Sequence, residues 1–176
     1  EFRWPLADAA PAVRSRQGKY RLRGVLPYEL SASGDVAAAN LAAVHVAVLG
    51  RLGSERLDAG QIRVDGYGGQ AELRGGVGWQ PRESWRLSGR ARALDTGLFD
   101  ERFPGRLGFD VEAGGEGFSP DGRIDLRITH LGGTLRNGRV SGGGQLIRQG
   151  ERLTFHDVDV RVGAARAKLE GGLAPD

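Results

Sequence analysis

Apolar and polar residues alternate with a period of two along most of this chain. From Trp85 onward one face of an expected strand carries apolar or small residues and the other carries mostly arginines: Trp85, Leu87, Gly89, Ala91 and Ala93 against Arg86, Ser88, Arg90 and Arg92. Successive side chains of a strand point to opposite faces of the sheet, so this pattern is typical of strands with one sheltered face. It predicts further strands at 107–113, 124–128, 140–146 and 153–162. We therefore expect an all-β fold of antiparallel strands.

Two positions between these strands carry local signals. The alternation changes parity at His156-Asp157, and a β-bulge at that pair would restore the register. The segment from Ser119 to Gly122 contains Pro and Asp before Gly, which predicts a turn.

Three stretches depart from the strand pattern. Residues 95–103 begin with Asp95, a good N-cap, and place Phe99 and Phe103 four residues apart, which predicts a short helix before Pro104. Residues 35–43 are rich in alanine, so helix and strand both stay open there. Residues 1–19, with Pro5 and Pro11, are expected to be an irregular entry at the edge of the segment, followed by the sheet over 20–176.

A sequence repeat links two distant parts of the chain. The segment 55–77 returns 96 residues later as 151–173, with Glu-Arg-Leu at the start and a Gly-Gly pair near the end of both copies. In both copies apolar and polar residues alternate, as is typical of strands. A repeated β unit predicts an elongated architecture in which the copies are equivalent strand groups.

Several glycines fall where the alternation calls for an apolar side chain: Gly24, Gly75, Gly89, Gly142, Gly144 and Gly171. A closed sandwich would be poorly filled by such rows. Three explanations stay open: two walls that approach closely, a space left for a ligand, or bends and bulges in a twisted sheet.

Composition narrows the classes of function. The 176 residues include 30 glycines, no cysteine and no methionine, so we expect a thin core, no thiolate metal site and a segment of something longer. The net charge is +3, but arginines are interleaved with acidic residues, which favours a solvated strand face over a nucleic-acid surface. No apolar run approaches the ~20 residues that span a bilayer, so any anchor is expected outside this segment.

Catalytic chemistry is not indicated. The three histidines, His45, His130 and His156, lie in separate expected strands, and the glycine-rich stretches lack the lysine and helix of a phosphate loop. We therefore expect a protein that is not an enzyme, without cofactor or metal, whose apolar strip is suited to holding something oily.

The order of short motifs resembles the TamB family. The resemblance rests on Gly75-Gly76-Val77-Gly78-Trp79-Gln80-Pro81, Trp85-Arg86-Leu87, Ala93-Leu94-Asp95, Phe103-Pro104-Gly105, Leu131-Gly132-Gly133-Thr134-Leu135 and Gly171-Gly172-Leu173. It covers about residues 20–174. Thr96 replaces a usual proline, and Asn137-Gly138 replaces a more apolar turn.

The resemblance implies a periplasmic segment of an inner-membrane-anchored envelope protein of Gram-negative bacteria. It implies a taco-like curved trough with an apolar interior, similar to AsmA-like and bridge-type lipid carriers. The implied partners are phospholipid acyl chains, a TamA-like outer-membrane barrel and outer-membrane barrel clients. Phospholipid transport and barrel assembly by strand pairing are both compatible with it.

The alternation also gives the lining expected for such a groove. Fourteen residues are predicted to face one interior: Leu73, Val77, Trp85, Leu87, Leu107, Phe109, Val111, Ile124, Leu126, Ile128, Leu146, Phe155, Val160 and Leu169. Five charged residues are predicted to face water: Arg86, Arg90, Arg92, Asp125 and Arg127.

Overall fold

A computed structural model describes residues 2–4, 13–15, 17–38, 42–118 and 122–174. Thirteen strands cover more than half of them. The strands are β1 (Phe2–Trp4), β2 (Val13–Ser15), β3 (Gly18–Arg23), β4 (Tyr28–Ala38), β5 (Val44–Leu52), β6 (Arg56–Gly66), β7 (Gly69–Gly78), β8 (Ser84–Asp95), β9 (Gly105–Glu116), β10 (Arg123–Leu135), β11 (Gly138–Gln149), β12 (Arg152–Val162) and β13 (Ala165–Leu173). The predicted all-β class is therefore confirmed.

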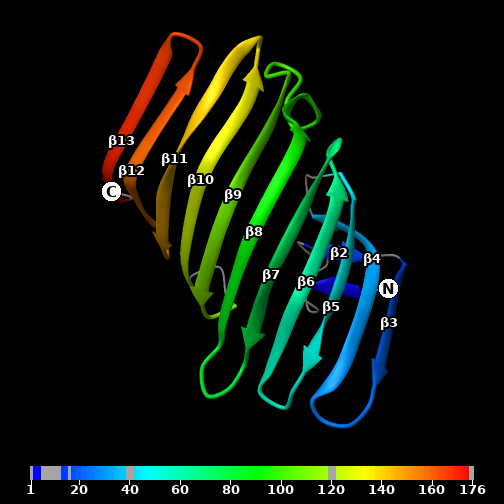
Figure 1. Cartoon of the computed structure of the whole chain (residues 1–176). Coiled ribbons are helices and arrows are strands. Elements are labelled where there is room, and N and C mark those ends of the chain that lie inside the picture. The colour runs from blue at the N-terminus through cyan, green and yellow to red at the C-terminus, as the bar shows by residue number, and fades with distance from the viewer. Residues whose placement is uncertain (1, 5–12, 16, 39–41, 119–121, 175–176) are drawn as a thin grey trace.

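The strands form one open antiparallel meander. From β4 to β13 each strand pairs with the next along the chain, and among the described strands no pair closes the sheet into a barrel. Figure 1 shows the long strands side by side in a curved, twisted sheet, with β3 at one edge and β13 at the other. In that view the loops at 67–68, 96–104, 136–137 and 163–164 form an upper rim, and those at 24–27, 53–55, 79–83 and 150–151 lie on a lower rim.

The repeat corresponds to two equivalent hairpins, as predicted. β6 and β12 begin at Arg56 and Arg152, 96 residues apart, and each pairs with the strand that follows it. The registers shift at the same place, between Ala59 and Ile62 in one copy and between Phe155 and Val158 in the other. The second shift also confirms the predicted bulge at His156-Asp157, where Asp157 has a φ of 50°.

The connection between β8 and β9 is a single 3₁₀ turn, η1 (Thr96–Leu98). Asp95 is its N-cap, as expected, and accepts a hydrogen bond from the Gly97 amide at 2.9 Å. The two phenylalanines do not form the expected helical pair: Phe99 stacks on Tyr67 with ring centroids 3.9 Å apart, and Phe103 lies beside the guanidinium of Arg136.

Three local predictions need correction. Residues 35–38 belong to β4, so the helical alternative for 35–43 is wrong there. The first nineteen residues contain β1, β2 and the start of β3 rather than only irregular chain. Gly24, with a φ of 84°, lies in the loop after β3 and not on a strand face. The turn predicted at 119–122 falls mostly outside the described residues, as do residues 39–41.

A bulge requires one more correction, at Ala93. An extra residue in β8 lies between Ala91 and Leu94, which pair with Phe109 and Leu107. Leu94 therefore continues the apolar face, and Ala93, with a φ of 56°, is exposed and does not belong to it. Single extra residues also occur in β6 and β10.

The described strands form one sheet, and few of their side chains are fully buried. Among the described residues the buried apolar side chains are Ala59, Ala91 and Val140, and no large side chain is fully buried. A single curved sheet with a half-buried apolar face is therefore the structure on which any site is built.

Candidate functional site

One face of the sheet is apolar from edge to edge. Cross-strand pairs join Leu73 to Gly89, Gly89 to Val111 and Val111 to Ile128. Paired residues point to the same side of a sheet. The register therefore places all fourteen predicted lining residues on one face, which we call the apolar face. That these residues line a groove for lipid remains a prediction.

The apolar face also includes strands that the prediction left out. In the first half of the sheet it carries residues of β4, β5 and β6: Leu30, Val46, Val48, Leu57, Ile62 and Val64. Val44, Val46, Val48, Ile62 and Val64 already alternated in the sequence, so this extension was readable there. Leu131 and Leu135 were missed because they follow the bulge in β10, which reverses the parity of the pattern. Val158 also lies on this face, directly after the bulge that the sequence did indicate in β12, although the predicted lining did not include it.

The apolar face is sheltered but not covered. Thirteen of the fourteen predicted residues are half-buried, and Leu169, on the edge strand β13, is 51% exposed. At the other edge Tyr20 is 80% exposed. Because the apolar strip runs out to both edges, it is a continuous surface rather than a closed core.

Glycines on this face mark close contacts between strands. A Cβ added at Gly75 would lie 2.0 Å from the Arg86 carbonyl oxygen, and one at Gly89 would lie 2.1 Å from that of Glu72. Trp85 lies across Gly115, where an added Cβ would be 2.5 Å from the indole Nε1. These contacts join neighbouring strands of one sheet, so of the explanations left open for the inward glycines they fit bends in a twisted sheet rather than two walls that approach closely.

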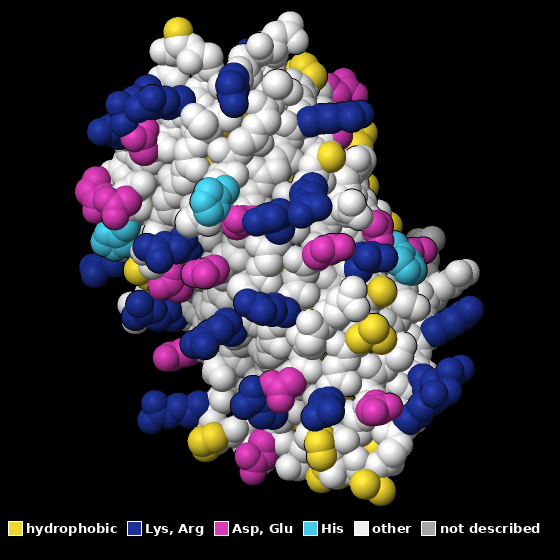
Figure 2. Space-filling model, in the orientation of Figure 1, with side chains coloured by type: hydrophobic (Ala, Val, Ile, Leu, Met, Phe, Trp, Pro, Cys, Tyr) yellow, Lys and Arg dark blue, Asp and Glu magenta, His cyan; other side chains and the backbone are white. Residues whose placement is uncertain are grey.

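The opposite face is charged. Figure 2 shows basic and acidic side chains interspersed across it, with few apolar ones. Arg86, Arg90, Arg92 and Arg127 are exposed there, and Asp125 is half-buried. Ion pairs between exposed side chains contribute little stability individually, so the main effect of the charged face is to keep one side of the sheet in contact with water.

Asp110 is the centre of the most developed ionic group on the charged face. It accepts hydrogen bonds from Arg90, which bonds both its carboxylate oxygens, and from His130 Nδ1 at 2.8 Å. The bonds from Arg90 first and from His130 second lower the pKa of the Asp110 carboxyl to about 2.

The other two histidines make similar cross-strand pairs. His45 Nδ1 lies 2.9 Å from Asp35, and His156 Nδ1 lies 3.2 Å from Glu170. These pairs lie far apart along the sheet, on β5, β10 and β12. Among the described residues no group of three His, Cys, Asp or Glu side chains could hold a metal ion.

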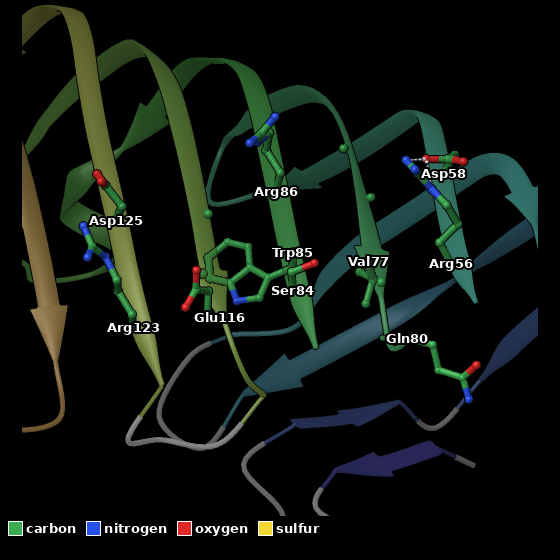
Figure 3. A pocket seen from close by; sticks show the side chains of 15 residues that line it. Arg56, Asp58, Val77, Gln80, Ser84, Trp85, Arg86, Glu116, Arg123 and Asp125 are labelled. Carbon is green, nitrogen blue, oxygen red and sulfur yellow. Dashed lines mark hydrogen bonds and ion pairs between the residues drawn. The ribbon is translucent and has the colours of Figure 1, made fainter. Parts of the chain in front are cut away.

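A hollow of about 590 Å³ lies along the lower part of the charged face (Figure 3). Arg86 stands between Gly76 and Gly114, its cross-strand partners, whose missing side chains create the space. Asp58, held by Arg56, and Asp125 lie on the strands to either side. Three arginines in its lining, Arg56, Arg86 and Arg123, are balanced by three acidic residues, Asp58, Glu116 and Asp125.

Comparison with known proteins gives one finding. The family model described as "TamB, N-terminal domain" matches residues 1–176. No curated protein and no solved structure matches significantly. In the part of the chain that the structure describes, no helix has the length and apolar character needed to cross a membrane.

Proposed function

Because the chain belongs to the TamB family, we propose that it is a segment of a periplasm-spanning envelope protein whose apolar face carries phospholipid acyl chains between the inner and outer membranes. The family is one of envelope transport and assembly proteins and not of enzymes. The observation that supports the proposal is the apolar face, which crosses the sheet and whose described side chains are mostly only half-buried.

The energetics of lipid movement support a surface without catalytic groups. Exposing a ~16-carbon acyl chain to water costs on the order of 12 kcal/mol, at about 0.8 kcal/mol per methylene. Contact with a continuous apolar face removes most of that cost at every point along the path. Eleven strands from β3 to β13, spaced by ~4.8 Å, give such a path a length of roughly 48 Å.

The proposal includes location and partners. The segment would lie in the periplasm, with its inner-membrane anchor elsewhere in the protein, and a TamA-like outer-membrane barrel would receive the far end. Both edge strands are exposed throughout, so neighbouring segments could extend the sheet and its apolar face at either edge.

A photocrosslinking residue at Phe109 tests the lipid path. In the intact protein in cells, this position should yield phospholipid adducts, because Phe109 lies on the apolar face beside Ala91. The matched control is Glu112, which lies on the same strand, points to the charged face and is exposed. Equal phospholipid capture at both positions, or capture of neighbouring strands alone at Phe109, would contradict the proposal.

The exposed edge strands favour one alternative function. β13 offers nine residues whose outer edge is unpaired among the described strands, which suits pairing with a strand of an outer-membrane barrel client. In that case the protein is a scaffold for barrel assembly, and the apolar face is only its core. A crosslinker at Ala167 in β13 that captures barrel proteins, with no lipid captured at Phe109, would support the scaffold over the conduit.

A further inference from the structure

The two rims of the apolar face differ in chemistry. Along the lower rim one cross-strand row runs through ten strands, from Tyr28 in β4 to Leu173 in β13. This row contains three side chains with an apolar body and a polar tip: Tyr28, Trp85 and Arg148. The corresponding upper row from β8 to β13 consists of Leu94, Leu107, Gly133, Val140, Val162 and Ala165.

Two polar tips of the lower row, those of Tyr28 and Trp85, reach water. Neither the Tyr28 hydroxyl nor the Trp85 indole N–H has a hydrogen-bond partner among the described residues, and no buried side-chain polar atom there is unsatisfied. Both groups are therefore open to solvent or to a ligand. Tyr, Trp and Arg favour boundaries where an apolar region meets a polar one, because one part of each side chain is apolar and the other is not.

Arg148 places a positive charge at the same boundary. It pairs across strands with Ile124 and Leu153, both on the apolar face, and its Nε donates to the Gly150 carbonyl at 3.0 Å. That bond holds the base of the guanidinium at the lower rim, next to the β11–β12 turn. A cation at the border of an apolar surface is suited to a phosphate whose attached chains lie on that surface.

From this asymmetry we propose an orientation for the bound lipid. A diacyl phospholipid lies along the strands with its phosphate and ester groups at the lower row, near Tyr28, Trp85 and Arg148, and with its acyl chains pointing toward the upper rim. The inference rests on the proposed function, since it assigns a direction to lipid on the apolar face.

The dimensions predict where the chains end. Half of a ~30 Å bilayer core gives ~15 Å for one acyl chain, which corresponds to roughly four or five residues along a strand at ~3.3 Å each. Counting from Trp85 and Ile124, the chain ends fall near the cross-strand row of Gly89, Val111 and Ile128.

Two photoreactive phospholipids test the orientation. They have identical chains, and one carries a diazirine on the head group while the other carries it at the end of an acyl chain. Each is delivered in phosphatidylglycerol vesicles to the intact protein, and adducts are mapped by mass spectrometry. We expect head-group adducts on the lower row and chain-end adducts near Val111 and Ile128.

A pair of variants tests the role of the charge. Arg148→Gln keeps a hydrogen-bond donor but removes the charge, and should lower the ratio of head-group to chain-end adducts at least threefold. Arg127→Gln removes an exposed arginine from the charged face of the neighbouring strand and should leave the ratio unchanged.

The outcomes separate this inference from the function on which it rests. Chain-end adducts on the apolar face with head-group adducts on the upper rim, or equally on both rims, would overturn the orientation and leave the lipid path intact. An unchanged ratio in Arg148→Gln would overturn the assigned contact. No chain-end adducts on the apolar face would overturn both the orientation and the proposed function.

Discussion

A charge placed on the apolar face should stop lipid movement without unfolding the protein. Leu126 is the position of choice, because it lies in β10 between Ala113 of β9 and Leu146 of β11 and is half-buried. Fully burying a leucine contributes about 1.5–3 kcal/mol, so the partial burial seen here contributes roughly 1–2 kcal/mol. In Leu126→Arg the guanidinium can reach water, because this position is only half-buried and the arginine stem still covers apolar surface.

The effect on transport should be much larger. An acyl chain that passes the new arginine must partly desolvate it, at a cost of about 3 kcal/mol. With tenfold in rate for each ~1.4 kcal/mol, phospholipid movement should slow roughly a hundredfold. Phospholipid transfer between the membranes by the intact protein measures the rate, and urea denaturation of the purified protein measures the stability.

The matched control is Thr129→Arg, which places the same charge on the exposed polar side of the same strand. This variant should transport like the wild type. The reasoning is refuted if Leu126→Arg loses more than about 4 kcal/mol of stability, as expected for a charge buried in a packed core. It is equally refuted if Leu126→Arg transports at the wild-type rate. Phe109→Asp should behave like Leu126→Arg.

Three further predictions concern stability. Gly75→Ala should lower the free energy of unfolding by about 1–3 kcal/mol, because the added methyl group meets a backbone carbonyl that cannot move easily. The control Gly172→Ala, where the nearest atom lies 3.5 Å from the added methyl group, should change the free energy of unfolding by no more than about 0.5 kcal/mol. The midpoints of urea denaturation compare the two variants. The pKa of Asp110 is lower in the folded state than in the unfolded state, so its ionised carboxylate stabilises the fold fully above about pH 4, and this contribution disappears as the pH falls through 2. The free energies of unfolding of Asp110→Asn and wild type should therefore differ at pH 6 and converge below pH 2. A difference in stability that persists at the lower pH would contradict this assignment. Trp79→Phe should cost about 1 kcal/mol, because it removes the 2.7 Å indole hydrogen bond that ties two lower-rim loops together, and amide exchange should speed up in both loops.

The sequence was sufficient for the fold class and for the faces of most strands. Period-two alternation identified the apolar face at Leu87, Val111 and Leu126, and the parity change at His156 identified one bulge correctly. The same reasoning could have identified the bulge at Thr129-His130, because Ile128 and Leu131 are three positions apart and both lie on the apolar face. Ala93 was misplaced because alanine fits either face, so its neighbours could not reveal the bulge.

Other features depend on contacts that alternation does not encode. The stacking of Phe99 on Tyr67 joins two loops that are over 20 residues apart, and it replaces the helical pairing that the spacing of Phe99 and Phe103 predicted. The alanine-rich part of β4 is extended because β5 pairs along it, and this tertiary pairing overrides helix propensity. The difference between the two rims was hidden because Tyr28, Trp85 and Arg148 fall in one row only when the eight strands from β4 to β11 are aligned.

The bulges point to a smaller building unit than the 96-residue repeat. From β6 to β12 every second strand, β6, β8, β10 and β12, carries one extra residue, and the strands between them carry none. One bulged strand and the plain strand after it therefore make a module, and the 96-residue displacement from β6 to β12 spans three such modules. A chain that gains or loses whole modules keeps its faces and its curvature. The length of the proposed lipid path would then grow in steps of two strand spacings, about 9.6 Å each.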